Sequence, residues 1–398
     1  MRRVAIVSPL RTPVGRFGGL LRDVPAEDLA ATVARAVVER SRIDPVRIDD
    51  VVFAQSYANS EAPCIGRWTA LHAGLPIEVP GMQLDRRCGG GLQAVVTAAM
   101  MVQSGAADVV LAGGVESMSN VEYYATHMRW GARSGSVQMH DRLERGRERS
   151  QPIERFGRIS GMIETAENLA REYGISREAS DAFAVRSHQR AVSAWRDGVF
   201  SEEVVPVAVT QKKGPSVLFD RDEGVRSDVS LSSLERLKPL TPNGVVTAGN
   251  ASQQNDAAAA CLVVAEEHLE ALGLEPLGWL VGWAAAGCDP ATMGIGPVPA
   301  TAKLLARLGL TLDEMDLVEV NEAFACQVLA VQKAWGWSDD DRLNVNGSGI
   351  SLGHPVGATG VRILTSMLHE LKRRRARFGL ETMCIGGGQG MAAVFERA

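Results

Sequence analysis

The sequence contains the stretch DRRCGGG at Asp85–Gly91, in which a cysteine precedes three glycines and an apolar helical pattern. Two other stretches are built alike: GHPVG at Gly353–Gly357 carries a histidine, and CIGGG at Cys384–Gly388 carries a second cysteine. A thiolate is a nucleophile, another thiol can act as a base, and an imidazole can polarise a carbonyl. Two thiols and one histidine in exposed turns indicate thioester carbon–carbon chemistry more than hydrolysis.

Around these stretches, strand-like and helix-like patterns alternate along the chain. This alternation predicts an α/β fold with a mainly parallel sheet and helices on its faces. The predicted strands are Val4–Val7, Asp50–Gln55, Asp108–Ala112 (ended by Gly113 and Gly114), Ala257–Ala265, Leu317–Val320 and Met383–Ile385. The predicted helices are Ala26–Arg40, Gly89–Gln103, Pro299–Leu308 and Gly360–Arg374.

The middle of the chain differs from its two ends. It is richer in charge and carries one clear helical pair, Ile163–Tyr173 and Ala179–Arg196. The segments VVLAGGVESM at 109–118 and TMCIGGGQGM at 382–391 resemble each other, which favours two similar halves. We therefore predict an N-terminal half at 1–120 plus 245–272, an inserted loop domain at 121–244, and a C-terminal half at 273–398.

Composition narrows the class of protein. A chain of 398 residues is long for a single core, and 45% hydrophobic with 22% charged residues is ordinary for a globular protein. The net charge of −5 offers no general basis for binding nucleic acid. No apolar run approaches the roughly 20 residues of a membrane span. Six cysteines without CxxC spacing argue against disulfides and structural zinc. We expect a cytoplasmic protein with no metal.

Cys88 is the strongest candidate for a catalytic nucleophile. Its place before a glycine-rich helix start puts the sulfur near a helix N-terminus, where a thiolate is stabilised. Arg86 and Arg87 add positive potential, and the glycines let a ligand approach the backbone closely. The alternative is a buried, inert cysteine.

Three more positions join Cys88 as candidates. His354 is held in a turn by the following proline and has glycines nearby, although a turn histidine satisfied by the backbone would look the same. Cys384 ends an apolar strand, and the Gly386 amide is free to form an oxyanion hole, although a core cysteine is the alternative. Asn321, at the end of a strand, can hold a water molecule; its alternative is a helix N-cap.

Together these stretches resemble the thiolase family, which includes acetyl-CoA acetyltransferases and 3-ketoacyl-CoA thiolases. The resemblance covers the whole chain and is nearest to bacterial short-chain β-ketothiolases. It implies a five-layer αβαβα fold of two βαβαβαββ halves with an inserted loop domain. The motifs that carry it are CGGGLQA from Cys88, GGVESMS from Gly113, TAGNAS from Thr247, MGIGPVPA from Met293, NEAFA from Asn321, GHPVGATG from Gly353 and CIGGGQG from Cys384.

The resemblance also implies a role for each site residue. Cys88 resembles the nucleophile that becomes acylated, and Cys384 the acid or base at the α-carbon. His354 and a water molecule held by Asn321 would form one oxyanion hole, and the amides of Cys88 and Gly386 the other. Substrate contacts are implied for Ser252 near the pantetheine, Arg226 near the CoA nucleotide, and Met162, Met293 and Phe324 in the acyl pocket.

The implied function is an acyl-CoA C-acyltransferase. It would condense acetyl-CoA with an acyl-CoA, or cleave a 3-ketoacyl-CoA with free CoA, through an acyl-Cys88 intermediate. No cofactor is implied beyond the CoA thioesters themselves. The family also implies a place in fatty acid metabolism and a homodimer or homotetramer, with Val121–Leu143 as a candidate assembly loop.

Two glycines depart from the family pattern, and two other functions compete. Gly90 replaces a usual serine and Gly161 a frequent histidine; both changes enlarge space, so we hypothesise that bulkier or branched acyl groups are accepted.

A decarboxylating ketosynthase relative would need no second catalytic cysteine, so Cys384 argues against it. A lipid- or acyl-CoA-binding protein without turnover would not need Cys88, His354, Asn321 and Cys384 all intact.

Overall fold

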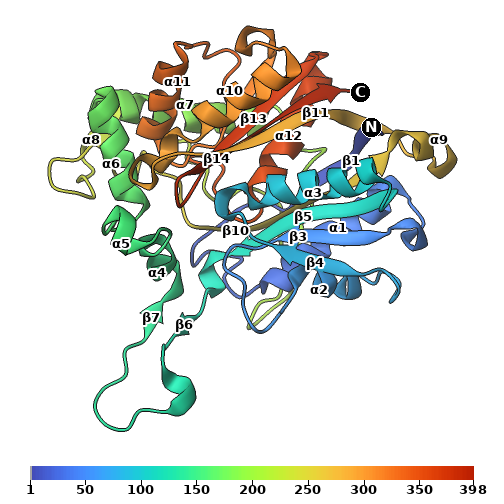
Figure 1. Cartoon of the computed structure of the whole chain (residues 1–398), viewed down its shortest axis with the longest axis horizontal. Coiled ribbons are helices and arrows are strands. Elements are labelled where there is room, and N and C mark those ends of the chain that lie inside the picture. The colour runs from blue at the N-terminus through green and yellow to red at the C-terminus, as the bar shows by residue number, and fades with distance from the viewer. Residues whose placement is uncertain (1) are drawn as a thin grey trace.

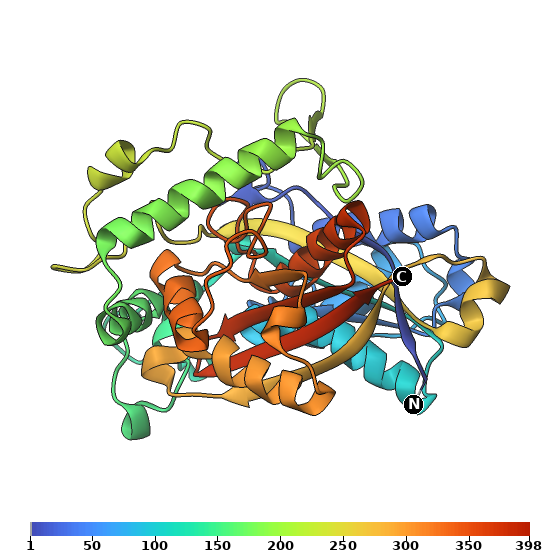
Figure 2. The same ribbon diagram turned by 90° about the horizontal axis from the view of Figure 1, so that it is seen from above.

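The structure, a computed structural model, describes residues 2–398; Met1, the first residue of the predicted N-terminal half, lies outside them. Its main feature is a ten-stranded sheet (Figures 1 and 2). The strands are β1 (Val4–Arg11), β2 (Gly15–Arg16), β3 (Asp50–Ala54), β4 (Gly81–Leu84), β5 (Val109–Ser117), β10 (Asn255–Ala265), β11 (Pro276–Gly287), β12 (Leu317–Val320), β13 (Phe378–Ile385) and β14 (Gln389–Arg397). Their order is β12-β13-β14-β11-β1-β10-β5-β3-β4, with β2 paired to β10.

The prediction of a mainly parallel sheet is wrong. The pairs β3–β4, β3–β5 and β12–β13 are parallel, whereas the remaining neighbours in this sheet are antiparallel. The connection between β13 and β14 shows why these two strands are antiparallel. The glycines at 386–388, where the predicted strand ends, form a tight turn, with Gly387 at φ 90° and Gly388 at φ 84°, that sends the chain straight back beside itself. Such a turn can join only antiparallel strands.

The sheet and helices form the five predicted layers (Figure 1). Helices α3 (Gly90–Ser104) and α12 (Thr359–Arg374) lie in the middle, between the two halves of the sheet, and pack on each other. One outer layer contains α1 (Ala26–Ser41) and α2 (Ile65–His72), and the other α10 (Pro297–Leu308) and α11 (Ala325–Trp335). Three apolar cores fill this arrangement: one under α1 and α2, one around α3 and α12 between the two halves of the sheet, and one under α10 and α11.

Strands β1, β5 and β13 run further than predicted; β13 begins at Phe378, before the predicted start at Met383. β1 continues through Pro9 because the register shifts between Val7 and Leu10, a bulge that accommodates a residue without an N–H. β5 continues through Gly113 and Gly114 to Ser117. A Cβ on Gly114 would lie 2.0 Å from the Gly357 carbonyl oxygen. The two glycines therefore do not end the strand; Gly114 makes room for the loop that carries His354.

The segment at 121–244 contains the predicted helical pair, as α6 (Met162–Tyr173) and α7 (Arg177–Arg196). A hairpin of β6 (Tyr123–Tyr124) and β7 (His140–Asp141) projects from the body (Figure 1). The buried Arg11 of β1 joins this segment to the sheet through Glu203 at 2.6 Å and Asp222 at 2.7 Å. The other elements are α4 (Arg142–Glu148), α5 (Ile153–Phe156), β8 (Val207–Val209), β9 (Val217–Phe219), α8 (Leu231–Glu235) and, beyond the segment, α9 (Leu269–Leu272).

Two absences are found among residues 2–398. Not one of the helices there has both the length and the apolar character that crossing a membrane requires. The same residues hold no cluster of three or more histidine, cysteine, aspartate or glutamate side chains arranged to bind a metal ion.

Candidate active site

Glycine contacts between α3 and α12 bring the two halves together at their helix N-termini. A Cβ on Gly360 would lie 2.1 Å from the Leu92 amide nitrogen, and one on Gly91 would lie 2.9 Å from that of Val361. Both distances are far below van der Waals contact, so only glycine allows this approach. The crossing places the turn with Cys88, which precedes α3, close to the loop with His354, which precedes α12.

Cys88 lies in the 3₁₀ turn Arg87–Gly89, directly before α3. Burial raises the pKa of its thiol above the usual value; a hydrogen bond from the Gly386 amide and the charge of Arg87 offset this only in part. The prediction of a stabilised thiolate is therefore wrong, because desolvation outweighs the helix terminus and the arginine. A neutral thiol needs a base before it can attack a thioester.

His354 is buried, and its ring is oriented by Thr359. The Nδ1 atom lies 2.6 Å from Thr359 Oγ1, and the same hydroxyl donates to the Pro355 carbonyl at 2.9 Å. Because the hydroxyl has only one proton, it must accept from Nδ1–H, which assigns the lone pair of the ring to Nε2. Burial, together with the charges of Arg362 and Arg147, lowers the pKa of His354 to about 3. The imidazole is neutral and has one basic nitrogen.

Replacing Thr359 with valine is expected to lower kcat by about 10- to 100-fold, because Nδ1–H loses its acceptor and the ring loses its orientation. Steady-state kinetics with acetoacetyl-CoA and CoA measure the effect. KM should change little, since Thr359 does not line the cavity. Thr359→Ser keeps the hydroxyl and should restore kcat. Equal losses in the serine and valine variants would show that Thr359 acts only through packing.

Asn321 follows β12 and lies beside His354. Its Nδ2 atom is 3.4 Å and 3.5 Å from the two ring nitrogens, and its buried Oδ1 has no hydrogen-bond partner within residues 2–398. The helix N-cap alternative is wrong, because α11 begins at Ala325 with Phe324 as its cap. The neighbouring Glu322 accepts hydrogen bonds from three groups, so it anchors the strand end: Ser187 Oγ, Asn344 Nδ2 and the Ile350 amide.

Cys384 is fully buried near the end of β13. It belongs to an apolar cluster with Met293 and Phe324, against which Met162 also packs. Burial, reinforced by the negative charge of a Cys88 thiolate, raises the pKa of the Cys384 thiol well above its usual value. Such a thiol is neutral at rest, and its thiolate, once formed, is a strong base.

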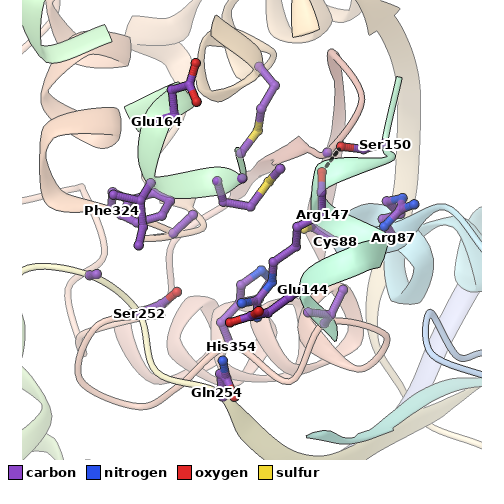
Figure 3. Close-up of a pocket in the computed structure, with 18 of the residues that line it drawn as sticks. Arg87, Cys88, Glu144, Arg147, Ser150, Glu164, Ser252, Gln254, Phe324 and His354 are labelled. Atoms are coloured by element: carbon purple, nitrogen blue, oxygen red, sulfur yellow. Dashed lines mark hydrogen bonds between the residues drawn. The ribbon is translucent and has the colours of Figure 1, made fainter. Parts of the chain in front are cut away.

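A cavity of about 660 Å³ joins most of the predicted residues (Figure 3). Its wall contains Cys88, His354, Gly386, Ser252, Met162, Met293 and Phe324. Asn321 lies behind this wall, beside His354. Cys384 also lies behind it, in the apolar cluster with Met293 and Phe324. Arg226 is the exception: its side chain is exposed outside the cavity, and its amide donates to His188 Nδ1 at 3.3 Å.

The two glycine departures differ in position. Gly161 lines the cavity, where its missing side chain leaves space. Gly90 does not line it, and a Cβ there would point at the Ala54 Cβ, 3.1 Å away. The expectation that Gly90 enlarges the pocket is therefore wrong, because its missing hydroxyl faces β3 inside the protein.

Sequence reasoning missed Thr359, Arg147 and Glu116. Glu116 is a buried carboxylate that accepts from the amides of Ser56, Tyr57 and Gly357, and burial raises its pKa to about 7. A hydroxyl five residues after a turn histidine was a usable signal for Thr359. Arg147 stood in a charged run that looked like solvated surface.

Comparison with known proteins decides the family. The family model for the thiolase N-terminal domain matches residues 4–267, and that for the thiolase C-terminal domain matches residues 274–397. The chain belongs to the thiolase family. The predicted family and fold are thereby confirmed.

Individual relatives of this thiolase match over their full lengths. The β-ketothiolase BktB of Cupriavidus necator is 46% identical, over 100% of this chain and 99% of the relative. The crystal structure of acetyl-CoA acetyltransferase from Bacillus anthracis has a TM-score of 0.96 at 41% identity and covers 100% of this chain and 99% of its own. Human mitochondrial 3-ketoacyl-CoA thiolase in complex with CoA has a TM-score of 0.93 at 39% identity, covering 100% and 98%.

Proposed function

We propose that this thiolase is an acyl-CoA C-acyltransferase that joins acetyl-CoA to an acyl-CoA, or cleaves the resulting 3-ketoacyl-CoA with CoA. The observation that carries the proposal is the single cavity at which Cys88 meets His354 and the Gly386 amide, with Cys384 directly behind. The full-length match to proteins named acetyl-CoA acetyltransferase and β-ketothiolase supports it.

In the first step, Cys88 Sγ attacks the thioester carbon and its proton passes to His354 Nε2. The Cys88 and Gly386 amides stabilise the oxyanion. The bond from carbon to the CoA sulfur then breaks, and the leaving thiolate takes the proton of Cys384 and departs as CoA. This step leaves an acyl group on Cys88, a thiolate on Cys384 and a proton on His354.

In the second step, the Cys384 thiolate takes an α-proton from acetyl-CoA. The enolate oxygen is stabilised by His354 and by a water molecule held by Asn321, whose buried Oδ1 has no partner among residues 2–398. The enolate carbon attacks the acyl carbon, and the bond to Cys88 breaks. Cys88 regains its proton from His354, so the enzyme returns to its starting state. The high pKa of the Cys384 thiol makes its thiolate basic enough for this task.

The CoA part of the substrate would enter past Ser252 and Gly161, which line the cavity. The complex of the human relative with CoA supports CoA binding by this chain. The exposed Arg226 would contact the nucleotide outside the cavity. Thiols, an imidazole and amides supply each chemical step, so the proposal includes no cofactor.

Assembly and location stay predictions. A homodimer or homotetramer through the hairpin at Val121–Leu143 is supported by the exposure of Tyr123 and Trp130, the latter 91% exposed. A cytoplasmic location and a place in fatty acid metabolism also stay predictions.

The test is to incubate the purified protein with CoA and 3-ketoacyl-CoAs of four to sixteen carbons and to follow acetyl-CoA formation. Peptide mass spectrometry after acetyl-CoA alone should find an acetyl group on Cys88. Binding of the thioesters without turnover or adduct would contradict the proposal and favour the non-catalytic alternative. Decarboxylation of malonyl-CoA without α-proton exchange would favour the ketosynthase alternative, which Cys384 argues against.

A further inference from the structure

Two arginines line the cavity beside the nucleophile. Arg87 precedes Cys88 in the 3₁₀ turn, and Arg147 comes from α4 in the inserted segment. Figure 3 shows both on the same side of the cavity as Cys88, across from Phe324. Both side chains are half-buried. Within residues 2–398, neither guanidinium group forms a hydrogen bond or a salt bridge with another side chain.

Both arginines lie on the cavity wall near the nucleophile. A Cβ on Gly146, the residue before Arg147, would lie 3.9 Å from Arg87 Nη1. A Cβ on Gly386 would lie 3.5 Å from Arg87 Cδ and 3.6 Å from Met162 Sδ. Arg87 therefore lies between helix α4 and the oxyanion amide, next to the acyl-side wall. Both arginines lower the pKa of the Cys88 thiol against the effect of burial, so their charges reach the reacting sulfur.

Like charges held together in a half-buried wall repel each other unless an anion lies between them. The carboxylates of the cavity do not supply it. Glu148 pairs with Arg158 at 2.9 Å, and Glu164 accepts from the amide and the hydroxyl of Ser160. Glu144 lines the wall but is exposed and forms no salt bridge within residues 2–398. Glu116 is occupied by three amides.

We propose that the acyl group transferred by this enzyme ends in a carboxylate, which binds between Arg87 and Arg147. The substrate class is thus the 3-ketoacyl-CoA of a dicarboxylic acid, and the inference rests on the proposed function. Met162, Met293 and Phe324 form the apolar wall for the methylene groups between thioester and carboxylate. A guanidinium group binds a carboxylate with charge-assisted, often bidentate hydrogen bonds.

The phosphates of CoA are a poorer match for these arginines. They lie at the far end of the pantetheine arm from the thioester sulfur. Arg87 and Arg147, in contrast, lie near the thioester end, since Arg87 is next to Gly386 and the charges of both arginines act on the Cys88 sulfur. An anion at this end of the substrate belongs to the acyl chain.

The test compares thiolysis of 3-ketoadipyl-CoA with that of 3-ketohexanoyl-CoA, which has the same number of carbons but a methyl end. The wild-type enzyme should favour the carboxylate substrate in kcat/KM by about tenfold or more. Arg147→Gln should lower this ratio by about tenfold, because the carboxylate loses one of its two cationic partners. General damage to catalysis would affect both substrates equally and would leave the ratio unchanged. The matched control is Arg149→Gln, an exposed arginine at the end of the same helix, which should keep the ratio.

The outcomes separate the two proposals. Turnover of 3-ketohexanoyl-CoA with no preference for 3-ketoadipyl-CoA would overturn the carboxylate site and leave the acyltransferase intact. A rise in KM for both substrates alike in Arg147→Gln would assign the arginine to CoA and also overturn it. No turnover of either substrate, or of acetoacetyl-CoA, would overturn the proposed function itself.

Discussion

Replacing Cys88 with alanine is expected to lower thiolysis and condensation by roughly 10⁴-fold or more, because the thiol that carries the acyl group is lost. The neutral thiol of Cys88 is positioned by the 3₁₀ turn and accepts a hydrogen bond from the Gly386 amide. Alanine removes the nucleophile but leaves the oxyanion site and the helix start in place. The folded protein should still bind substrate.

The measurement combines steady-state kinetics with mass spectrometry of the intact protein after acetyl-CoA. Wild type should gain one acetyl group and Cys88→Ala none. Cys64→Ser is the matched control, since Cys64 is an exposed thiol before α2, outside the cavity. It should keep activity and the adduct. If peptide analysis of the Cys88→Ala variant found an acetyl group on another cysteine, that cysteine would be the nucleophile.

Replacing Cys384 with alanine is expected to remove α-proton transfer, with condensation falling by about 10³-fold or more, while Cys88 is still acylated. The two thiols have different roles because they have different surroundings. Cys88 lines the cavity, whereas Cys384 is fully buried in the apolar cluster behind it. Burial makes the Cys384 thiolate the stronger base. In the Cys384→Ala variant, CoA can depart as an unprotonated thiolate, so the first step still occurs at a lower rate.

Exchange of the acetyl-CoA α-protons in deuterated water measures this step directly. Wild type should exchange them, and Cys384→Ala should not, although its Cys88 gains the acetyl group. Cys326→Ala makes the same truncation in the same cluster, where Cys326 only donates to the Ala166 carbonyl at 3.5 Å. It should retain exchange. Normal exchange in the Cys384→Ala variant would show that another group is the base, and His354 would be the first candidate.

Several features of the site could be predicted from local sequence. Cys88 and His354 lie in glycine-rich turns, and Cys384 lies in the strand that leads into one; this pattern marks a reactive side chain held where a ligand can approach. The helices α3, α6, α7, α10 and α12 begin and end within two residues of the predicted bounds, because their apolar residues recur with the helical period. Such signals depend only on near neighbours in the chain.

Other features could not be predicted, because they depend on what the chain meets far away. Strand direction follows from which strands pair, and period-two patterns are the same in parallel and antiparallel sheets. Gly90 was expected to enlarge the pocket, but the fold places it against Ala54, outside the cavity. The charged run around Arg147 was typical of solvated surface, but α4 places Arg147 in the cavity wall, which Arg87 also lines. The pKa of Cys88 is raised because burial, which only packing creates, outweighs the local helix terminus.

The sequence by itself determined the family, the order of elements and the chemistry available: two thiols, an imidazole and an amide in turns that glycine keeps open. Only the tertiary structure decided which groups meet. The close crossing of α3 and α12 at Gly91 and Gly360 joins residues from two halves in one cavity, since backbone contact there leaves no room for a side chain. The tautomer of His354 and the paired arginines also follow from this packing, because each depends on partners brought close only by the fold.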